Sequence, residues 1–116
     1  MRYLTILNEA PYGNERAYNG LRLAINLAKR DDVELSIFLM ADAVGCARAG
    51  QKTPDGYYNI ERMLVAIINK QGQVKACGTC EEARGLEKLS LIDGIQVSTM
   101  SQLAQWVVES DKALTF

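Results

Sequence analysis

The stretch ELSIFLM, residues 34–40, decides the fold of this chain. It is a nearly continuous apolar run that follows the polar break RDDV at residues 30–33. Strands in the middle of a parallel sheet have this composition, because helices cover both of their faces. The run therefore predicts a central strand of a parallel sheet.

Short segments rich in β-branched or aromatic residues occur on both sides of this central strand. Each of them is bounded by glycine, proline or polar residues, which is typical of strands. We expect four further strands, at residues 3–8, 73–77, 94–98 and 112–116.

Helical spacing of apolar residues separates the expected strands. Three helices are predicted, and the candidate N-caps are Asn14, Asn59 and Thr99, the last paired with Gln102 in the pattern of a capping box. The predicted buried faces are Ala17, Leu21, Ala24, Ile25 and Ala28 in the first helix, Ile60, Met63, Leu64, Ile67 and Ile68 in the second, and Leu103, Ala104, Val107 and Val108 in the third.

The alternation of strands and helices along residues 1–116 predicts one domain, a three-layer α/β/α sandwich with right-handed crossovers. Residues 41–58 form the longest irregular stretch, and a short helical turn is expected at its start. A loop of this length is typical of a lid, a binding loop or a subunit contact, or else of a disordered segment.

Composition and charge exclude several classes of function. Thirteen basic side chains nearly cancel fourteen acidic ones, the net charge is −1, and no run of like charge could attract nucleic acid. No apolar run is long enough to be a membrane span or a secretory leader. An odd number of cysteines without such a leader indicates free thiols in the cytoplasm. We expect a cytoplasmic protein with no nucleic-acid or membrane partner and no cofactor.

Ligands of a parallel sheet bind beyond the carboxyl ends of its strands. Three loops leave those ends here, at residues 9–14, 41–58 and 77–85. The candidate residues in the first two loops are Tyr12 and Asp42. Asp42 is expected to N-cap the following turn, with ligand orientation as the alternative, and the same two interpretations stay open for Tyr12.

The third loop lies in KACGTCEEARG, residues 75–85, and contains Cys77 and Cys80. A zinc site needs four ligands, whereas the chain offers only Cys46 besides this pair and has no histidine, so no metal is expected. Packing as small apolar residues accounts for Cys46 but poorly for two thiols in a Gly- and Thr-containing turn. A thioredoxin-like dithiol remains an alternative, although the usual neighbours of such a pair are missing.

Thiol chemistry requires a thiolate that substrate can reach. Gly78 or Thr79 is expected to begin a short helical turn directly after Cys77, so unpaired amide N–H groups would lie near both sulfurs. We therefore expect the Cys77 sulfur to be reachable by solvent and biased toward its anion by these amides.

Charged side chains in the same turn act in opposite directions. Arg84 follows Cys80 by four residues and would share its face of a helix, where a positive charge could stabilise a thiolate or orient an anionic sulfur. Glu81 and Glu82 would repel a thiolate. The sign of their combined effect on the thiol pKa stays open at the level of sequence.

Four segments resemble the small DsrE/DsrF-like proteins, and most closely their YchN-like branch. They are NEAPYGNERAYNGLRLA at 8–24, FLMADAVGCARAGQK at 38–52, KACGTCEEARG at 75–85 and ESDKALTF at 109–116. The resemblance runs over essentially the whole chain. It implies a flavodoxin-like α/β/α fold with a mainly parallel sheet of about five strands, and assembly into trimers or hexamers.

The resemblance also implies a sulfur-relay role. In the better understood members, a cysteine after the third strand accepts sulfane sulfur as a persulfide and passes it to a partner. That cysteine precedes an Arg-Gly step, and Cys77, ahead of Arg84 and Gly85, takes its place here. Cys80 is not general in the family, and it would act as a resolving thiol.

Two classes of function therefore follow from the sequence. The first is a sulfur carrier or sulfurtransferase that exchanges sulfur with donor and acceptor proteins through Cys77 and Cys80, with Gly78, Thr79, Arg84, Asp42 and Tyr12 as candidate substrate-binding residues. The second is a non-catalytic oligomeric module that binds a small ligand or a partner between subunits. Whether the chain has catalytic turnover stays open in both.

Overall fold

Five parallel strands form a single sheet in the computed structural model, which describes residues 1–116. The strands are β1 (Arg2–Leu7), β2 (Glu34–Leu39), β3 (Gln73–Cys77), β4 (Ile95–Ser98) and β5 (Lys112–Thr115). Their order across the sheet is β4-β3-β2-β1-β5, and every neighbouring pair is parallel. The central position of β2 confirms the prediction made from residues 34–40.

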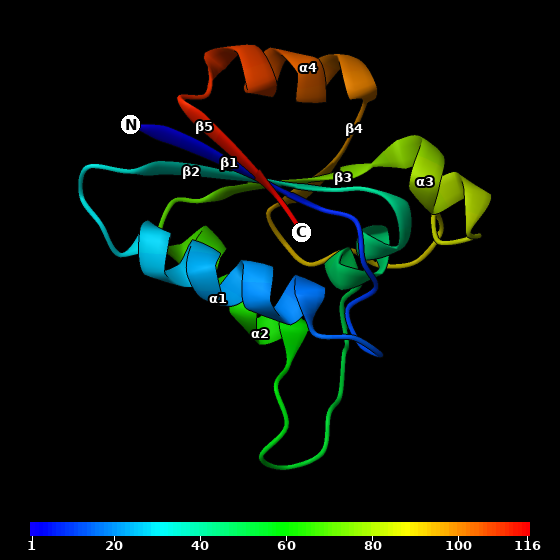
Figure 1. Cartoon of the computed structure of the whole chain (residues 1–116). Coiled ribbons are helices and arrows are strands. Elements are labelled where there is room, and N and C mark those ends of the chain that lie inside the picture. The colour runs from blue at the N-terminus through cyan, green and yellow to red at the C-terminus, as the bar shows by residue number, and fades with distance from the viewer.

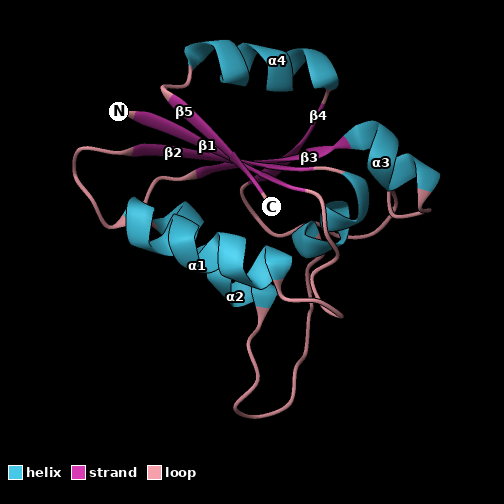
Figure 2. Cartoon of the chain, in the orientation of Figure 1, coloured by secondary structure: helices cyan, strands magenta, loops and turns pink.

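Helices cover both faces of this sheet (Figure 1). Helices α1 (Arg16–Ala28) and α2 (Ile60–Asn69) lie on one face, and α4 (Met100–Glu109) lies on the other. The short helix α3 (Gly78–Ala83) follows β3 directly, and the 3-10 helix η1 (Ala41–Ala47) follows β2 after one residue. Figure 2 shows the resulting three layers, which confirm the predicted α/β/α sandwich.

The two faces of the sheet carry cores of different size. Seventeen buried residues, among them Leu21, Ile37 and Leu64, pack between the sheet and α1 and α2. The cluster on the side of α4 has only five buried members, which are Leu4, Phe38, Val44, Cys77 and Leu103. Apolar burial drives folding roughly in proportion to area, so α1 and α2 carry most of the stabilisation. The candidate cysteine belongs to the smaller cluster.

The predicted buried face of α4 is wrong at three of its four positions. Leu103 is buried, but Ala104 is exposed, Val107 is 45% exposed and Val108 is 80% exposed. Trp106 takes their place, with its ring edge-on to Phe38 at 6.2 Å between centroids. The large indole reaches the sheet where a valine side chain would not, and this sets the rotation of the helix.

The helix N-caps agree with the sequence in two of three cases. Asn59 and Thr99 accept hydrogen bonds from the third following amide, at 3.0 and 3.3 Å. Glu15, not Asn14, precedes α1, while Asn14 accepts from the N–H of Arg16 at 3.0 Å in a tighter turn. The cap prediction at Asn14 is therefore wrong by one residue.

The long segment between β2 and α2 begins with a short helix, η1, as expected, and continues as an irregular loop that projects from the molecule (Figure 1). Gln51 holds the base of this loop. Its side chain donates to the carbonyls of Cys46 and Arg48 at 2.9 Å and accepts from the Tyr12 hydroxyl at 2.6 Å. Near the projecting part, Tyr58 stacks on Tyr18 with centroids 4.1 Å apart.

None of the helices combines the length and the apolar character that crossing a lipid bilayer requires.

Candidate functional site

Cys77 and Cys80 lie together at the carboxyl edge of the sheet. Cys77 is the last residue of β3 and pairs in register with Ser98 of β4, whereas Cys80 lies in the first turn of α3. Both are free thiols, and they differ in burial: Cys77 is 6% exposed and Cys80 is half-buried. The short chain between them makes the two sulfurs neighbours, close enough for Cys80 to influence the pKa of Cys77.

The environment of Cys77 favours the neutral thiol. Burial raises the pKa of Cys77 above its ordinary value of 9.0, and the neighbouring Cys80 side chain raises it further. The amides of Cys80 and Thr79 lower the pKa of Cys77, although neither makes a hydrogen bond of regular geometry to its sulfur. The donors expected from sequence are present, but the expected bias toward the anion is wrong, because desolvation outweighs them. The expected access of solvent is wrong as well, because only 6% of Cys77 is exposed.

A backbone amide from another element points at Cys80. The N–H of Ala41 donates to the Cys80 sulfur at 3.2 Å. Ala41 is the first residue of η1 and has a φ of 51°, in the left-handed region that alanine rarely occupies. Nothing in the sequence indicated this contact, because alanine gives no signal for left-handed backbone.

Arg84 and Asp42 join the two loops that carry these groups. Arg84 Nε donates to Asp42 Oδ1 at 2.9 Å, and its Nη1 donates to the carbonyl of Cys80 at 3.1 Å. Met40 is the N-cap of η1 and Asp42 lies in its first turn, so the cap prediction for Asp42 is wrong. This ion pair connects the C-cap of α3 to η1, although the two residues lie 42 positions apart in the chain.

Gly78 and Thr79 complete the turn after Cys77. A Cβ atom at Gly78 would lie 2.8 Å from Cγ1 of Val97, so the close approach of α3 to β4 requires glycine. The side chain of Thr79 is exposed, and only its amide faces the Cys77 sulfur. Both residues therefore shape the turn with their backbone.

Tyr12 does not join the cysteine pair. It packs against the larger core, on the opposite face of the sheet from Cys77. Its hydroxyl donates to Gln51 and accepts from the N–H of Ile60 at 3.1 Å. Both interactions are internal, and they fasten the loop after β1 to the base of the long loop.

The burial of Glu81 is a feature of the site that the sequence did not reveal. It is 2% exposed, and its Oε1 has no hydrogen-bond partner. Burial raises the pKa of the Glu81 carboxyl above its ordinary 4.5. The adjacent Glu82 is exposed, so the two glutamates of the turn, equivalent in sequence, have different surroundings.

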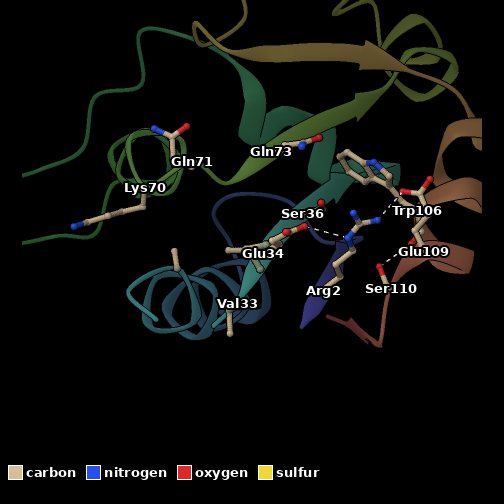
Figure 3. Close-up of a pocket in the computed structure, with 12 residues that line it drawn as sticks. Arg2, Val33, Glu34, Ser36, Lys70, Gln71, Gln73, Trp106, Glu109 and Ser110 are labelled. Carbon is tan, nitrogen blue, oxygen red and sulfur yellow. Dashed lines mark hydrogen bonds and ion pairs between the residues drawn. The ribbon is translucent and has the colours of Figure 1, made fainter. Parts of the chain in front are cut away.

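A second candidate site is a polar hollow of about 340 Å³ at the opposite edge of the sheet, shown in Figure 3. Arg2, Glu34 and Gln73, the first residues of β1, β2 and β3, line it together with Glu109 and Trp106 of α4. Arg2 is already paired with Glu34 at 3.0 Å and Glu109 at 3.6 Å. Ligands of parallel sheets collect at the other edge, so the cysteine site remains the better candidate.

These features define a class of protein: a three-layer α/β/α fold with a thiol pair at the carboxyl end of its third strand. The chain belongs to the DsrE/DsrF-like family, whose sequence model matches residues 1–116. Family membership supports a function of the sulfur-relay type.

Individual relatives agree with this assignment. Protein YchN of Escherichia coli K12 is 44% identical over 99% of this chain and 98% of its own. An uncharacterised protein of Methanocaldococcus jannaschii is 40% identical over the full length of both chains. The crystal structure of the Escherichia coli YchN protein superposes with a TM-score of 0.92 at 45% identity and covers both chains completely. A protein of unknown function from Methanobacterium thermoautotrophicum shares the fold, with a TM-score of 0.79 at 15% identity over 99% of this chain and 98% of its own.

Proposed function

We propose that this chain is a cytoplasmic sulfur-relay protein that carries sulfane sulfur as a persulfide on Cys77, with Cys80 as the resolving thiol. The observation that carries the proposal is the pairing of two free, neighbouring thiols at the ligand-binding edge of a DsrE/DsrF-like fold. Arg84 supports it, because its Nη2 has no partner within the chain and could bind an anionic sulfur.

The chemistry is thiol exchange. A thiolate attacks the terminal sulfur of a donor persulfide, a new S–S bond forms, and the donor leaves as a thiolate. An acceptor thiolate then takes the terminal sulfur in the same way and restores the thiol. Alternatively Cys80 attacks the inner sulfur of a Cys77 persulfide, which gives a Cys77–Cys80 disulfide and releases hydrosulfide.

The partners required by this chemistry are a donor protein and an acceptor protein with reactive thiols.

We also propose that the chain assembles as a trimer or a hexamer. Large apolar side chains remain exposed along and near α4, and they are typical of a surface that another protein covers. They are Val97, Met100, Val107 and Val108.

Intact-mass spectrometry after incubation with glutathione persulfide tests the relay. We expect a +32 Da adduct, the mass of one sulfur atom, that is removed by excess thiol and is absent from the double variant Cys77→Ser/Cys80→Ser. An adduct that peptide mapping places on Cys80 alone in the fully loaded wild type would exclude Cys77 as the carrier of sulfur.

A non-catalytic binding module is the second candidate, favoured by the stacked tyrosines beside the projecting loop. Tyr57 and Tyr58 stack with centroids 4.5 Å apart, and Arg22 lies 5.4 Å from the ring centroid of Tyr18. A melting temperature raised by a small anion such as sulfate, and raised equally after loss of both cysteines, would favour this function over sulfur relay.

A further inference from the structure

The two thiols of the site differ in how easily a donor can reach them. Cys77 is 6% exposed and belongs to the apolar cluster beneath α4, whereas Cys80 is half-buried and only packs against the edge of that cluster. A persulfide donor must bring its terminal sulfur to within bonding distance of the attacking thiolate. The more exposed position of Cys80 therefore favours it for the first exchange.

The hydrogen bond to Cys80 also favours this thiol for the first exchange. The Ala41 N–H, 3.2 Å from the Cys80 sulfur, is a donor placed where negative charge develops when that thiol loses its proton. Ala41 keeps this orientation at a φ of 51°, which is unfavourable for a residue with a Cβ atom. Cys77 has no comparable donor from another element, and burial raises its pKa.

The side chain of Arg84 holds the Ala41 amide in position next to Cys80. Arg84 binds Asp42 of η1 with one nitrogen and the carbonyl of Cys80 with another. The start of η1, which presents the Ala41 amide, and the helix that carries Cys80 are therefore linked by the same side chain. The relative position of amide and sulfur does not depend on α3 alone, which is only six residues long.

We propose that Cys80 is the thiol that takes sulfur from the donor, and that Cys77 receives it from Cys80 and holds it. In the first step the Cys80 thiolate attacks the terminal sulfur of the donor, and the donor leaves as a thiolate. In the second step Cys77 attacks the terminal sulfur on Cys80, whose own sulfur leaves as a thiolate and takes up the proton that Cys77 gives up. Neither step changes the oxidation state of the system. This order of transfer rests on the proposed relay function and assigns a separate role to each thiol.

Loading kinetics of single-cysteine variants test this order. Protein is mixed with glutathione persulfide, quenched with an alkylating reagent at successive times, and mapped by peptide mass spectrometry. We expect Cys80→Ser to load on the order of tenfold or more slowly, because it lacks the accessible thiol with its hydrogen-bond donor. We expect Cys77→Ser to load Cys80 at the wild-type rate and to lose that sulfur to added thiol faster than the wild type does, because Cys80 is not buried.

The third cysteine provides the matched control. Cys46→Ala removes a thiol that is fully buried outside the site, so its loading rate should equal that of the wild type. If Cys80→Ser loads Cys77 as fast as the wild type does, the proposed order is overturned while the relay survives. If the wild type takes up no sulfur, the relay itself fails.

Replacing the Ala41 amide by an ester, with lactate in place of alanine, tests the role of the Ala41 N–H as a hydrogen-bond donor to Cys80. The substitution keeps the methyl side chain and removes the N–H. We expect iodoacetamide to alkylate Cys80 on the order of tenfold more slowly at neutral pH, while the rate at Cys77 stays constant. Unchanged alkylation of Cys80 would remove Ala41 as a positioning residue, and faster alkylation of Cys77 would indicate a loosened fold instead.

Discussion

Residue-scale effects in this molecule depend on which groups surround chemically identical side chains. Cys46, Cys77 and Cys80 are all free thiols, yet Cys46 lies in the larger core with no exposed surface and has its pKa raised to about 12 by burial. Cys46 therefore behaves as a small apolar residue, as its sequence context predicted. Its chemistry differs from that of the pair because solvent does not reach it and burial dominates its surroundings.

Cys46 makes the stability of the fold depend on pH in the alkaline range. Its thiol is neutral in both states below its ordinary pKa of 9.0. Between 9.0 and about 12 the unfolded chain loses this proton and the folded chain keeps it, so the free energy of unfolding falls as pH rises. The loss due to this thiol is at most about 1.4 kcal/mol per pH unit.

Urea unfolding of the wild type and of Cys46→Ala, at about pH 8 and about pH 10.5, checks this dependence. The other groups with raised pKa values are shared by both proteins, so they cancel in the comparison. We expect the wild type to lose more stability between the two pH values than the variant does. Equal losses would show that Cys46 titrates normally in the fold.

Glu81 should destabilise the fold at neutral pH. Its carboxyl pKa is raised by burial, so the neutral form is the one that the fold favours, and the stability that this group provides is present below 4.5 and is lost as pH rises through the raised pKa. Replacing it by an apolar residue removes the partnerless oxygen. We expect Glu81→Met to raise the free energy of unfolding by about 1 kcal/mol at neutral pH.

The same comparison at about pH 4 is the control, because a protonated carboxyl no longer carries a buried charge. The gain from Glu81→Met should shrink there, and the matched variant Glu82→Met, at an exposed position, should show little change at either pH. A gain that is equal at both pH values would point to better packing alone.

At this scale the sequence placed the cysteine pair at the ligand-binding edge but could not assign the state of each thiol. The groups that distinguish them come from distant parts of the chain: the amide of Ala41 lies 39 positions from Cys80, and Asp42 lies 42 positions from Arg84. No local pattern encodes such a contact, because it depends on how two loops pack after the sheet has formed.

Element-scale behaviour is clearest in α4, where Leu103 is buried and Val108 is 80% exposed. We expect Leu103→Ala to lower the free energy of unfolding by about 2–3 kcal/mol, since it leaves a cavity in a small cluster. Val108→Ala should change it by less than about 0.5 kcal/mol. Chemical denaturation of both variants under conditions in which the chain is monomeric provides the comparison, and a larger effect at Val108 would restore the helix face predicted from the sequence.

The error in α4 has a physical origin. Leu103, Ala104, Val107 and Val108 form an unbroken apolar stripe, and a stripe of this kind normally faces the core. The rotation of the helix is set instead by Trp106, because its ring meets Phe38 of the central strand. Helix α2 shows the opposite case, since Ile60, Leu64 and Ile67 are buried as predicted and no bulky residue on another face competes with them.

At the scale of the whole molecule, the strands and the three layers were predictable, whereas the order of the strands in the sheet was not predicted. Strand and helix segments alternate along the chain, and glycine, proline or polar residues mark their ends. The rule for parallel crossovers leaves few arrangements of such segments. All five strands therefore lie where the sequence placed them. The exposed apolar side chains of α4 have no covering group within the chain, and the assembly proposed above rests on them.

The assembly proposed above leads to a direct measurement. Only 27 of the 116 residues are buried, so a single chain leaves much apolar surface in contact with water. We expect light scattering to give the mass of a trimer or a hexamer of the 12.8 kDa chain. Val108→Asp should lower this mass without altering far-ultraviolet circular dichroism. The control Asn26→Asp, which places the same charge at an exposed position of α1 on the other face of the sheet, should not lower it. A monomeric wild type would contradict the proposal.

The left-handed backbone at residue 41 has a consequence for surveys of other genomes. Valine, isoleucine and threonine resist this conformation strongly, whereas glycine, asparagine and aspartate adopt it readily. A homologous chain with a β-branched residue at this position could not aim its amide as Ala41 does. The residue at position 41 can therefore be used to divide other sequences into those that can direct this backbone N–H at the second cysteine and those that cannot.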